Sequence, residues 1–204
     1  MQEKPKRKGS KYHHGDLRAA LLKAGIDELA AKGYEGFTLR GVAKRAGVSH
    51  AAPAHHFRDT NALLTALTAL AAERFSAAMR ERQAKARKEP RAQLIAAGQG
   101  YIDFALANPA LFKLMFGSER SDSDDPDVVR HATDAFTLLV GSVAAVRESE
   151  PLASDAGRLD VAAAWSIVHG IANLLIAGRL RFLEPQLEKD RDGTLARLID
   201  RTLP

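Results

Sequence analysis

The sequence contains no cysteine and few aromatic residues, which make up 6% of its 204 residues. Without cysteine the chain can form neither a disulfide framework nor a thiolate metal site, and nothing indicates an oxidising compartment. We therefore expect a cytoplasmic protein. Valine, isoleucine, threonine and aromatic residues rarely alternate with polar residues, whereas alanine and leucine are abundant. This composition favours helices over strands and predicts an all-α fold.

An export signal is also missing from the first residues. The basic residues 1–11 are not followed by an apolar run with a small-residue cleavage site. The longest charge-free run, residues 161–178, is close to the minimum length of a membrane span. It contains Ser166, His169, Asn173 and two glycines, so we expect a buried helix there and no membrane as a partner.

Positive charge is concentrated at the start of the chain. Residues 1–58 contain 12 Lys or Arg against 5 Asp or Glu, a net charge of +7, whereas residues 59–204 contain 18 against 20, a net charge of −2. A basic head on a nearly neutral body suits a nucleic-acid-binding end joined to a part with another task. Composition leaves open a basic tail that serves only solubility.

Apolar spacing and capping signals predict a helix from about Asp16 to Lys32, ended by Gly33. Thr38 is placed to cap a second helix through Ala46, and Ser49 to cap a third that ends near Phe57. The body is predicted to contain six further helices, at residues 61–88, 91–107, 110–116, 127–148, 155–183 and 192–203.

The segment Thr38 to Phe57 has the layout of a helix-turn-helix, in which the second short helix enters the major groove. Lysine and arginine neutralise phosphates, and short side chains at the start of that helix allow close approach to base edges. Arg45 is one of the donors around this segment. The predicted DNA contacts are Thr38, Arg40, Lys44, Ser49, His50, Ala51, His55 and Arg58.

Five short motifs, in this order and spacing, resemble the DNA-binding domain of TetR-family regulators: Tyr12 to Arg18, Gly33-Tyr34, Phe37 to Arg40, Ala46 to Ser49 and His56-Phe57. Tyr101 to Phe116 and Trp165 to Gly170 are similar to one of the family's carboxy-terminal subtypes. The resemblance implies a homodimeric, all-helical regulator that binds a double-stranded DNA operator and is released by a small effector.

On this basis we expect a flexible basic arm at residues 1–11 and a helix-turn-helix DNA-binding domain at residues 12–58. Residues 59–204 are expected to form a helical domain that binds the effector and dimerises. A repressor with an apolar effector is the expected function.

The segment before His56 departs from the family pattern. Family members usually carry Gly-Thr-Leu-Tyr-Tyr where this chain has Ala51 to His55, and a lysine where Thr60 stands. Pro53 removes an amide donor from the recognition helix and is able to shift its start. We expect His55 and Arg58 to replace the missing contacts. A TetR-fold protein whose operator binding has decayed is the alternative.

A stripe of small residues on the helix from residue 161 to 183 predicts the dimer interface. Small side chains let a second helix approach closely, and the stripe consists of Ala163 with the predicted interface residues Ser166, Gly170, Asn173 and Ala177. A bulkier stripe beside it, including Val161 and Val168, is expected to pack into the protomer. Paired with the final helix, this helix would form a four-helix interface.

The large and polarisable residues of the body are candidates for an effector site. We predict that the effector is bound by Tyr101, Phe104, Phe112, Phe136, Trp165 and His169, with Met115 and Phe116 also available. Taken one by one, most of these residues are better explained as core residues. His169 is either a hydrogen-bonded core residue or the polar handle of the site.

Catalytic and metal-binding patterns are absent from the sequence. It contains no nucleophile paired with a base, no glycine-rich phosphate loop and no Glu-x-x-His pairs, so we do not expect an enzyme. Five of the seven histidines lie in residues 13–56, but adjacent histidines on a short helix point apart and no carboxylate cluster accompanies them. The acidic cluster of Asp122, Asp124 and Asp125 lacks the spacing of a calcium loop. No cofactor and no metal are expected.

Overall fold

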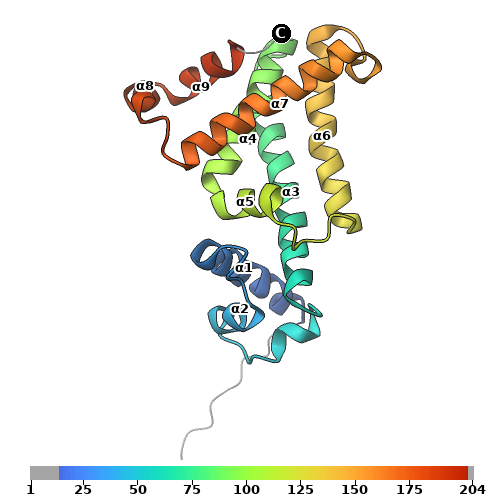
Figure 1. Cartoon of the computed structure of the whole chain (residues 1–204), viewed down its shortest axis with the longest axis vertical. Helices are drawn as coiled ribbons and strands as arrows, with labels where there is room; N and C mark the ends of the chain where they lie inside the picture. The colour runs from blue at the N-terminus through green and yellow to red at the C-terminus, as the bar shows by residue number, and fades with distance from the viewer. Residues whose placement is uncertain (1–13, 202–204) are drawn as a thin grey trace, which may run out of the picture.

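The described part of the chain folds into helices joined by short loops. The structure is a computed structural model that describes the backbone of residues 14–201 and the side chains of residues 17–201. Within these residues there is no strand, which confirms the all-α prediction (Figure 1). The α-helices are α1 (His14–Lys32), α2 (Leu39–Ala46), α3 (Thr60–Lys85), α4 (Pro90–Ala107), α5 (Pro109–Gly117), α6 (Pro126–Arg147), α7 (Asp155–Ile176), α8 (Glu184–Lys189) and α9 (Arg191–Asp200). The 3-10 helices are η1 (Ala52–His55), η2 (Pro151–Ala153) and η3 (Arg181–Leu183). The predicted arm, Tyr12 and His13 lie outside the described residues.

Local capping places the first helices where the sequence predicts them. The Thr38 hydroxyl accepts a hydrogen bond from the Gly41 amide at 3.1 Å, and the Asp59 carboxylate accepts one from Ala62 at 2.8 Å. Gly47 ends α2 with a φ of 69°, a left-handed conformation that favours glycine. The turn of the helix-turn-helix is thus built by the residues that the sequence assigned to it.

The long helix α3 joins the small head, α1 and α2, to the larger body (Figure 1). It contacts α1 at one end and α4 and α6 along the rest of its length. One apolar cluster runs from Phe37 and Val42 in the head through Leu64 of α3 into the body. At Gly100 a Cβ atom would lie 2.5 Å from the Ala78 carbonyl oxygen, so α4 and α3 approach as closely as glycine alone allows.

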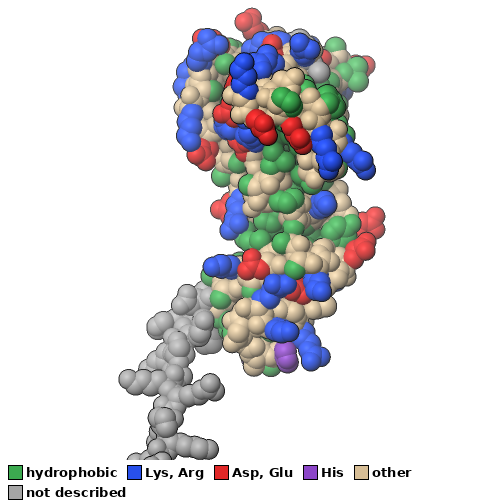
Figure 2. All heavy atoms as spheres, turned by 90° about the vertical axis from the view of Figure 1, so that its left-hand side faces the viewer, with side chains coloured by type: hydrophobic (Ala, Val, Ile, Leu, Met, Phe, Trp, Pro, Cys, Tyr) green, Lys and Arg blue, Asp and Glu red, His purple; other side chains and the backbone are tan. Residues whose placement is uncertain are grey.

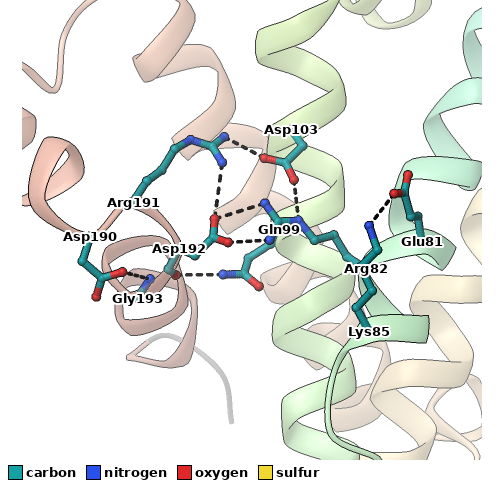
Figure 3. Close-up of polar contacts among 9 residues, drawn as sticks. All are labelled: Glu81, Arg82, Lys85, Gln99, Asp103, Asp190, Arg191, Asp192 and Gly193. Carbon is teal, nitrogen blue, oxygen red and sulfur yellow. Dashed lines mark hydrogen bonds and ion pairs between the residues drawn. The ribbon is translucent and has the colours of Figure 1, made fainter.

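A polar network fixes the last helix to the body. The Arg82 guanidinium of α3 contacts Asp103 of α4 at 2.6 Å and Asp192 of α9 at 2.7 Å (Figure 3). Arg191 also pairs with Asp103, at 2.7 Å, and the Gln99 side chain donates to the Asp192 carbonyl. The hydrogen bonds that Arg82 makes with Asp192 and Asp103 raise the pKa of Arg82. The same bond between Arg82 and Asp192 lowers the pKa of Asp192. Three helices are therefore joined through one cation.

The helix predicted from Asp155 to Leu183 is shorter and more exposed than expected. It ends at Ile176, because Gly178 adopts a left-handed φ of 63° before η3 and α8 begin. Only Val161, Ala164, Val168, Ala172 and Gly157 of α7 are buried. Within the protomer α7 is buried on one side, and the predicted burial of its other side by a second chain stays a prediction. The other predicted helix bounds in the body agree within about three residues.

Two helices, α3 and α7, are long and apolar enough to cross a bilayer by length and composition alone. This is weak evidence, because the core helix of a globular protein meets the same criteria. The apolar window of α3 is 61% buried inside the protein, as a core helix requires, whereas that of α7 is 22% buried. The exposed apolar surface of α7 therefore needs another explanation.

Candidate functional site

All eight predicted DNA contacts are solvent-exposed and lie on α2, on η1 or on the segments beside them. Lysine, arginine and histidine side chains gather at the free end of the head (Figure 2). Arg40 and Lys44 are four residues apart on α2, so they lie on one face of it. This end of the head therefore presents cations together with short polar side chains.

Two of the basic side chains near this face are engaged within the protein. Arg45, which the sequence placed among the DNA donors, pairs instead with the buried carboxylate of Glu28 in α1. That carboxylate lies so close to α2 that a Cβ at Gly41 would clash with it. Arg58 remains exposed but lies 3.2 Å from the Asp59 carboxylate. Arg45 therefore holds α2 on α1 although it is itself exposed, and Arg40 and Lys44 are exposed cations of α2 that make no ion pair with another described residue.

The predicted third α-helix, from Ser49 to near Phe57, is not formed. Residues 52–55 form the single 3-10 turn η1, and Ala52 donates to the Ser49 carbonyl at 3.0 Å. Pro53 explains the difference, because it has no amide hydrogen to donate and it disfavours the α conformation of the residue before it. Pro53 is also buried, whereas His50, Ala51 and His55 around it stay exposed. The recognition element is thus a short turn anchored by a proline.

A cavity of about 200 Å³ lies in the body, enclosed mainly by α3, α4, α6 and α7. None of the described residues in its wall carries a charge. Three aromatic side chains of the wall are partly exposed at its rim, namely Phe116 at 39%, Phe136 at 42% and Trp165 at 41%. The cavity therefore suits an uncharged, apolar molecule.

Three of the six predicted effector residues, Tyr101, Phe136 and Trp165, line this cavity. Phe104 and Phe112 are core residues that lie outside its wall, so this cavity does not include them. His169 is also outside the wall, but its Nδ1 atom lies 2.7 Å from the Tyr101 hydroxyl. The wall residues missed by the sequence reasoning include Thr68, Phe75, Met79 and Val128, whose helical spacing is that of ordinary core residues.

Tyr101, His169 and Trp165 form a polar cluster at the cavity wall. The Trp165 indole N–H points to the Tyr101 hydroxyl at 3.4 Å, which is long for a hydrogen bond. Burial raises the pKa of Tyr101 and lowers the pKa of His169. Both groups are therefore neutral near pH 7, and the cluster offers hydrogen bonds without charge.

The loop between α5 and α6 connects the cavity to the head. Met115 of α5 and Val128 of α6, on either side of this loop, are wall residues. Within the loop, Arg120 donates hydrogen bonds to the Tyr34 carbonyl between α1 and α2 and, at 3.4 Å, to the Asn61 side chain. The sequence reasoning missed Arg120, since an arginine in a polar loop gives no signal of such a contact.

The predicted interface stripe is accessible on α7. Ser166, Asn173 and Ala177 are exposed, and a Cβ atom at Gly170 would meet no other atom within 4 Å. Two exposed leucines, Leu159 and Leu174, extend the apolar face. The final helix behaves differently from our expectation. Leu195 and Ile199 of α9 are buried inside the protomer, whereas Leu198 is only partly buried.

Two family models match the sequence. The model described as "Bacterial regulatory proteins, tetR family" matches residues 21–67, and "Tetracyclin repressor-like, C-terminal domain" matches residues 94–202, more than half of the chain. A curated relative, the HTH-type transcriptional regulator BetI of Yersinia pestis, is 30% identical over 114 residues. That match covers 55% of this chain and 58% of the relative.

Solved structures share the fold over nearly the whole chain. A protein of unknown function from Rhodococcus sp. RHA1 is 34% identical, covers 93% of this chain and 98% of its own, and superposes with a TM-score of 0.74. The fatty acid degradation regulator FadR from Bacillus halodurans shares the fold at 15% identity, with a TM-score of 0.67 over 92% of this chain and 100% of its own. With an exposed helix-turn-helix head and a helical body, and with both family models matched, this chain belongs to the TetR family of DNA-binding transcription regulators.

Proposed function

We propose that this protein is a cytoplasmic repressor whose dimer binds a double-stranded DNA operator and leaves it when a small apolar effector enters the cavity of the body. Residues 12–58 would be the DNA-binding domain, residues 59–204 the effector-binding and dimerisation domain, and residues 1–11 a basic arm. The observation that carries this proposal is the position of Arg120. It contacts the head from the loop between α5 and α6, two helices that both line the cavity.

The DNA contacts follow from the exposed residues of the head. Arg40 and Lys44 on α2 would neutralise phosphates, while His50, Ala51 and His55 around η1 would approach the base edges. Thr38 would combine its capping role with a phosphate contact, and Ser49 and Arg58 would complete the set proposed from the sequence. Because the Arg58 guanidinium is paired with the Asp59 carboxylate, we expect Arg58 to contribute less than Arg40 to DNA affinity.

Dimerisation would use the small-residue face of α7. Ser166, Gly170, Asn173 and Ala177 allow a second α7 to approach closely, and exposed Leu174 would be buried with them. Because Leu195 and Ile199 of α9 are buried within the protomer, α9 would join the interface only through its partly exposed side, and its pairing with α7 stays a prediction. Two heads held this way would read half-sites about one turn of DNA, roughly 34 Å, apart.

Release of DNA would follow from a shift of the loop between α5 and α6. A ligand that fits only one arrangement of Met115 and Val128 would favour that arrangement, and Arg120 would carry the shift to Tyr34 in the head. A ligand changes an equilibrium only by its difference in affinity for the two states. The operator must therefore weaken effector binding by the same factor as the effector weakens operator binding.

A second candidate function is supported by the recognition turn. Because η1 is a single 3-10 turn and Arg45 is engaged with Glu28, the alternative is a TetR-fold protein whose operator binding has decayed. It would act as a ligand-binding or interaction module with the same fold. Such a protein would bind random DNA and its own promoter equally.

The two candidates are separated by fluorescence anisotropy with the protein's own upstream DNA and a scrambled duplex of equal length. The repressor proposal predicts that upstream DNA binds at least about 1,000-fold more tightly than the scrambled duplex at physiological salt. A reporter gene behind the same promoter should be silenced when the protein is expressed. Equal affinity for both duplexes would contradict operator binding. Activation of the reporter gene would show that the protein is an activator and not a repressor.

A further inference from the structure

The Tyr101 hydroxyl has an unfilled hydrogen-bonding position at the wall of the cavity. A tyrosine hydroxyl can donate one hydrogen bond and accept two. In this structure it makes one bond with His169 at 2.7 Å and one long contact with the Trp165 indole N–H at 3.4 Å. One further bond is therefore available to Tyr101, and the indole N–H is weakly satisfied as well.

The nature of the open position depends on the tautomer of His169. If Tyr101 donates its proton to Nδ1, the open position on the hydroxyl is an acceptor. If Nδ1 instead carries a proton and donates it, the Tyr101 hydroxyl proton is left to be donated. A ligand hydroxyl can both donate and accept, so it fits either arrangement. A carbonyl group fits only the second.

Charge is excluded by the rest of the wall. Its described residues are apolar or neutral, and the burial that lowers the pKa of His169 keeps that imidazole neutral. An ion that entered would lose its hydration and find no opposite charge. The volume, about 200 Å³, is in the range that accepts one small ring with a short substituent.

We propose that the ligand of this cavity is a small, uncharged molecule with an aromatic or aliphatic body and one hydroxyl group, which bonds to Tyr101. The inference rests on the effector cavity of the proposed function and specifies its ligand class. The apolar body packs among Phe75, Met79 and Met115, and the hydroxyl lies beside Tyr101 and the Trp165 indole N–H.

The test uses four probes with one carbon skeleton: phenylpropanol, propylbenzene, phenylpropanoate and phenylpropylammonium. Calorimetric titration gives the affinity of each for the wild-type dimer and for Tyr101→Phe, which keeps the ring but loses the hydroxyl. Tyr34→Phe, in the head, is the matched control, because it removes a tyrosine hydroxyl outside the cavity and keeps the main-chain carbonyl that Arg120 contacts. Trp165 is the only tryptophan in the chain, so its fluorescence reports whether a probe is in this cavity.

Phenylpropanol should bind about three- to tenfold more weakly to Tyr101→Phe than to the wild type, the change expected from one neutral hydrogen bond. Propylbenzene should change by less than about twofold, and Tyr34→Phe should leave both affinities unaltered. Both ions should bind more than about tenfold more weakly than the alcohol. Equal effects of Tyr101→Phe on alcohol and hydrocarbon, tighter binding of either ion, or binding of none of the four would overturn the proposal.

DNA release is measured separately, by anisotropy with upstream DNA. If phenylpropanol binds in a Tyr101-dependent way but leaves DNA affinity unchanged, the ligand class stands and the effector role fails. If propylbenzene releases DNA as well as the alcohol does, and Tyr101→Phe has no influence, the effector role stands and the hydroxyl assignment fails.

Discussion

Replacing Gly170 by leucine tests the proposed dimer interface without disturbing the protomer. A Cβ atom at this position meets no other atom within 4 Å, so the leucine side chain enters open space in the isolated protomer. Glycine inside a helix is about 0.8–1 kcal/mol less favourable than alanine, and leucine is close to alanine. The free energy of unfolding of the protomer should therefore stay the same or rise by up to about 0.8 kcal/mol.

The dimer should respond in the opposite direction. Overpacking a close contact costs about 1–3 kcal/mol, and a twofold interface presents the substitution twice. A total of roughly 2–6 kcal/mol corresponds to a dissociation constant at least about 30-fold higher. Operator binding should weaken with it, since two heads are needed to read two half-sites.

Sedimentation velocity over a range of concentrations measures the dissociation constant, and thermal unfolding measures the protomer. Gly141→Leu on α6 is the matched control, because a Cβ there also meets nothing within 4 Å. It should gain helix stability and remain dimeric. An intact Gly170→Leu dimer would refute the proposed interface, and an unfolded Gly170→Leu protomer would refute the open space around Gly170.

Three further predictions concern the cavity and the polar contacts. Arg120→Ala should retain phenylpropanol binding but lose most of the ligand-induced release of DNA, whereas Arg130→Ala should behave as the wild type in the same anisotropy assay; loss of release in both would contradict a specific role of Arg120. Burial lowers the pKa of His169, so the unfolded chain binds this proton more readily and stability is lost as the pH falls through about 6.5. His169→Asn should remove that part of the loss in urea unfolding between about pH 5 and 8, and an unchanged acid response would contradict it. Arg82→Met should lower the free energy of unfolding by only about 1 kcal/mol at low salt, because its ion pairs with Asp103 and Asp192 are partly exposed; a loss above about 3 kcal/mol would show that the network contributes far more than such pairs do.

Much of the head was predictable because its signals are local. The Thr38 cap, the Gly47 turn and the Asp59 cap each act within a few residues, and each forms as the sequence predicts. The failure at residues 49–57 is also local. The capping signal at Ser49 predicts an α-helix, but Pro53, four residues later, lacks the amide hydrogen that such a helix needs.

The cavity and the interface were less predictable because apolarity does not say what covers a side chain. Phe104, Phe112 and Phe136 are all phenylalanines in apolar helical segments, yet the first two are core residues and Phe136 is at the rim of the cavity. The apolar helix α7 was predicted to be buried on more than one side, and one of these sides would be covered only by a second chain. Ion pairs such as Arg45 with Glu28, 17 positions apart, follow only from the packing of helices.

Operator binding by the head is tested by the salt dependence of binding to upstream DNA, measured for the wild type and for the double variant Arg40→Gln, Lys44→Gln. Both side chains are exposed on α2, so the dimer should lose up to four phosphate contacts. Each contact contributes about 0.9 to the slope of log affinity against log salt concentration, so the slope should fall by up to about 3.6. The folded, dimeric variant should also bind upstream DNA more weakly at every salt concentration. An unchanged slope, with unchanged affinity, would show that this face of the head does not contact DNA.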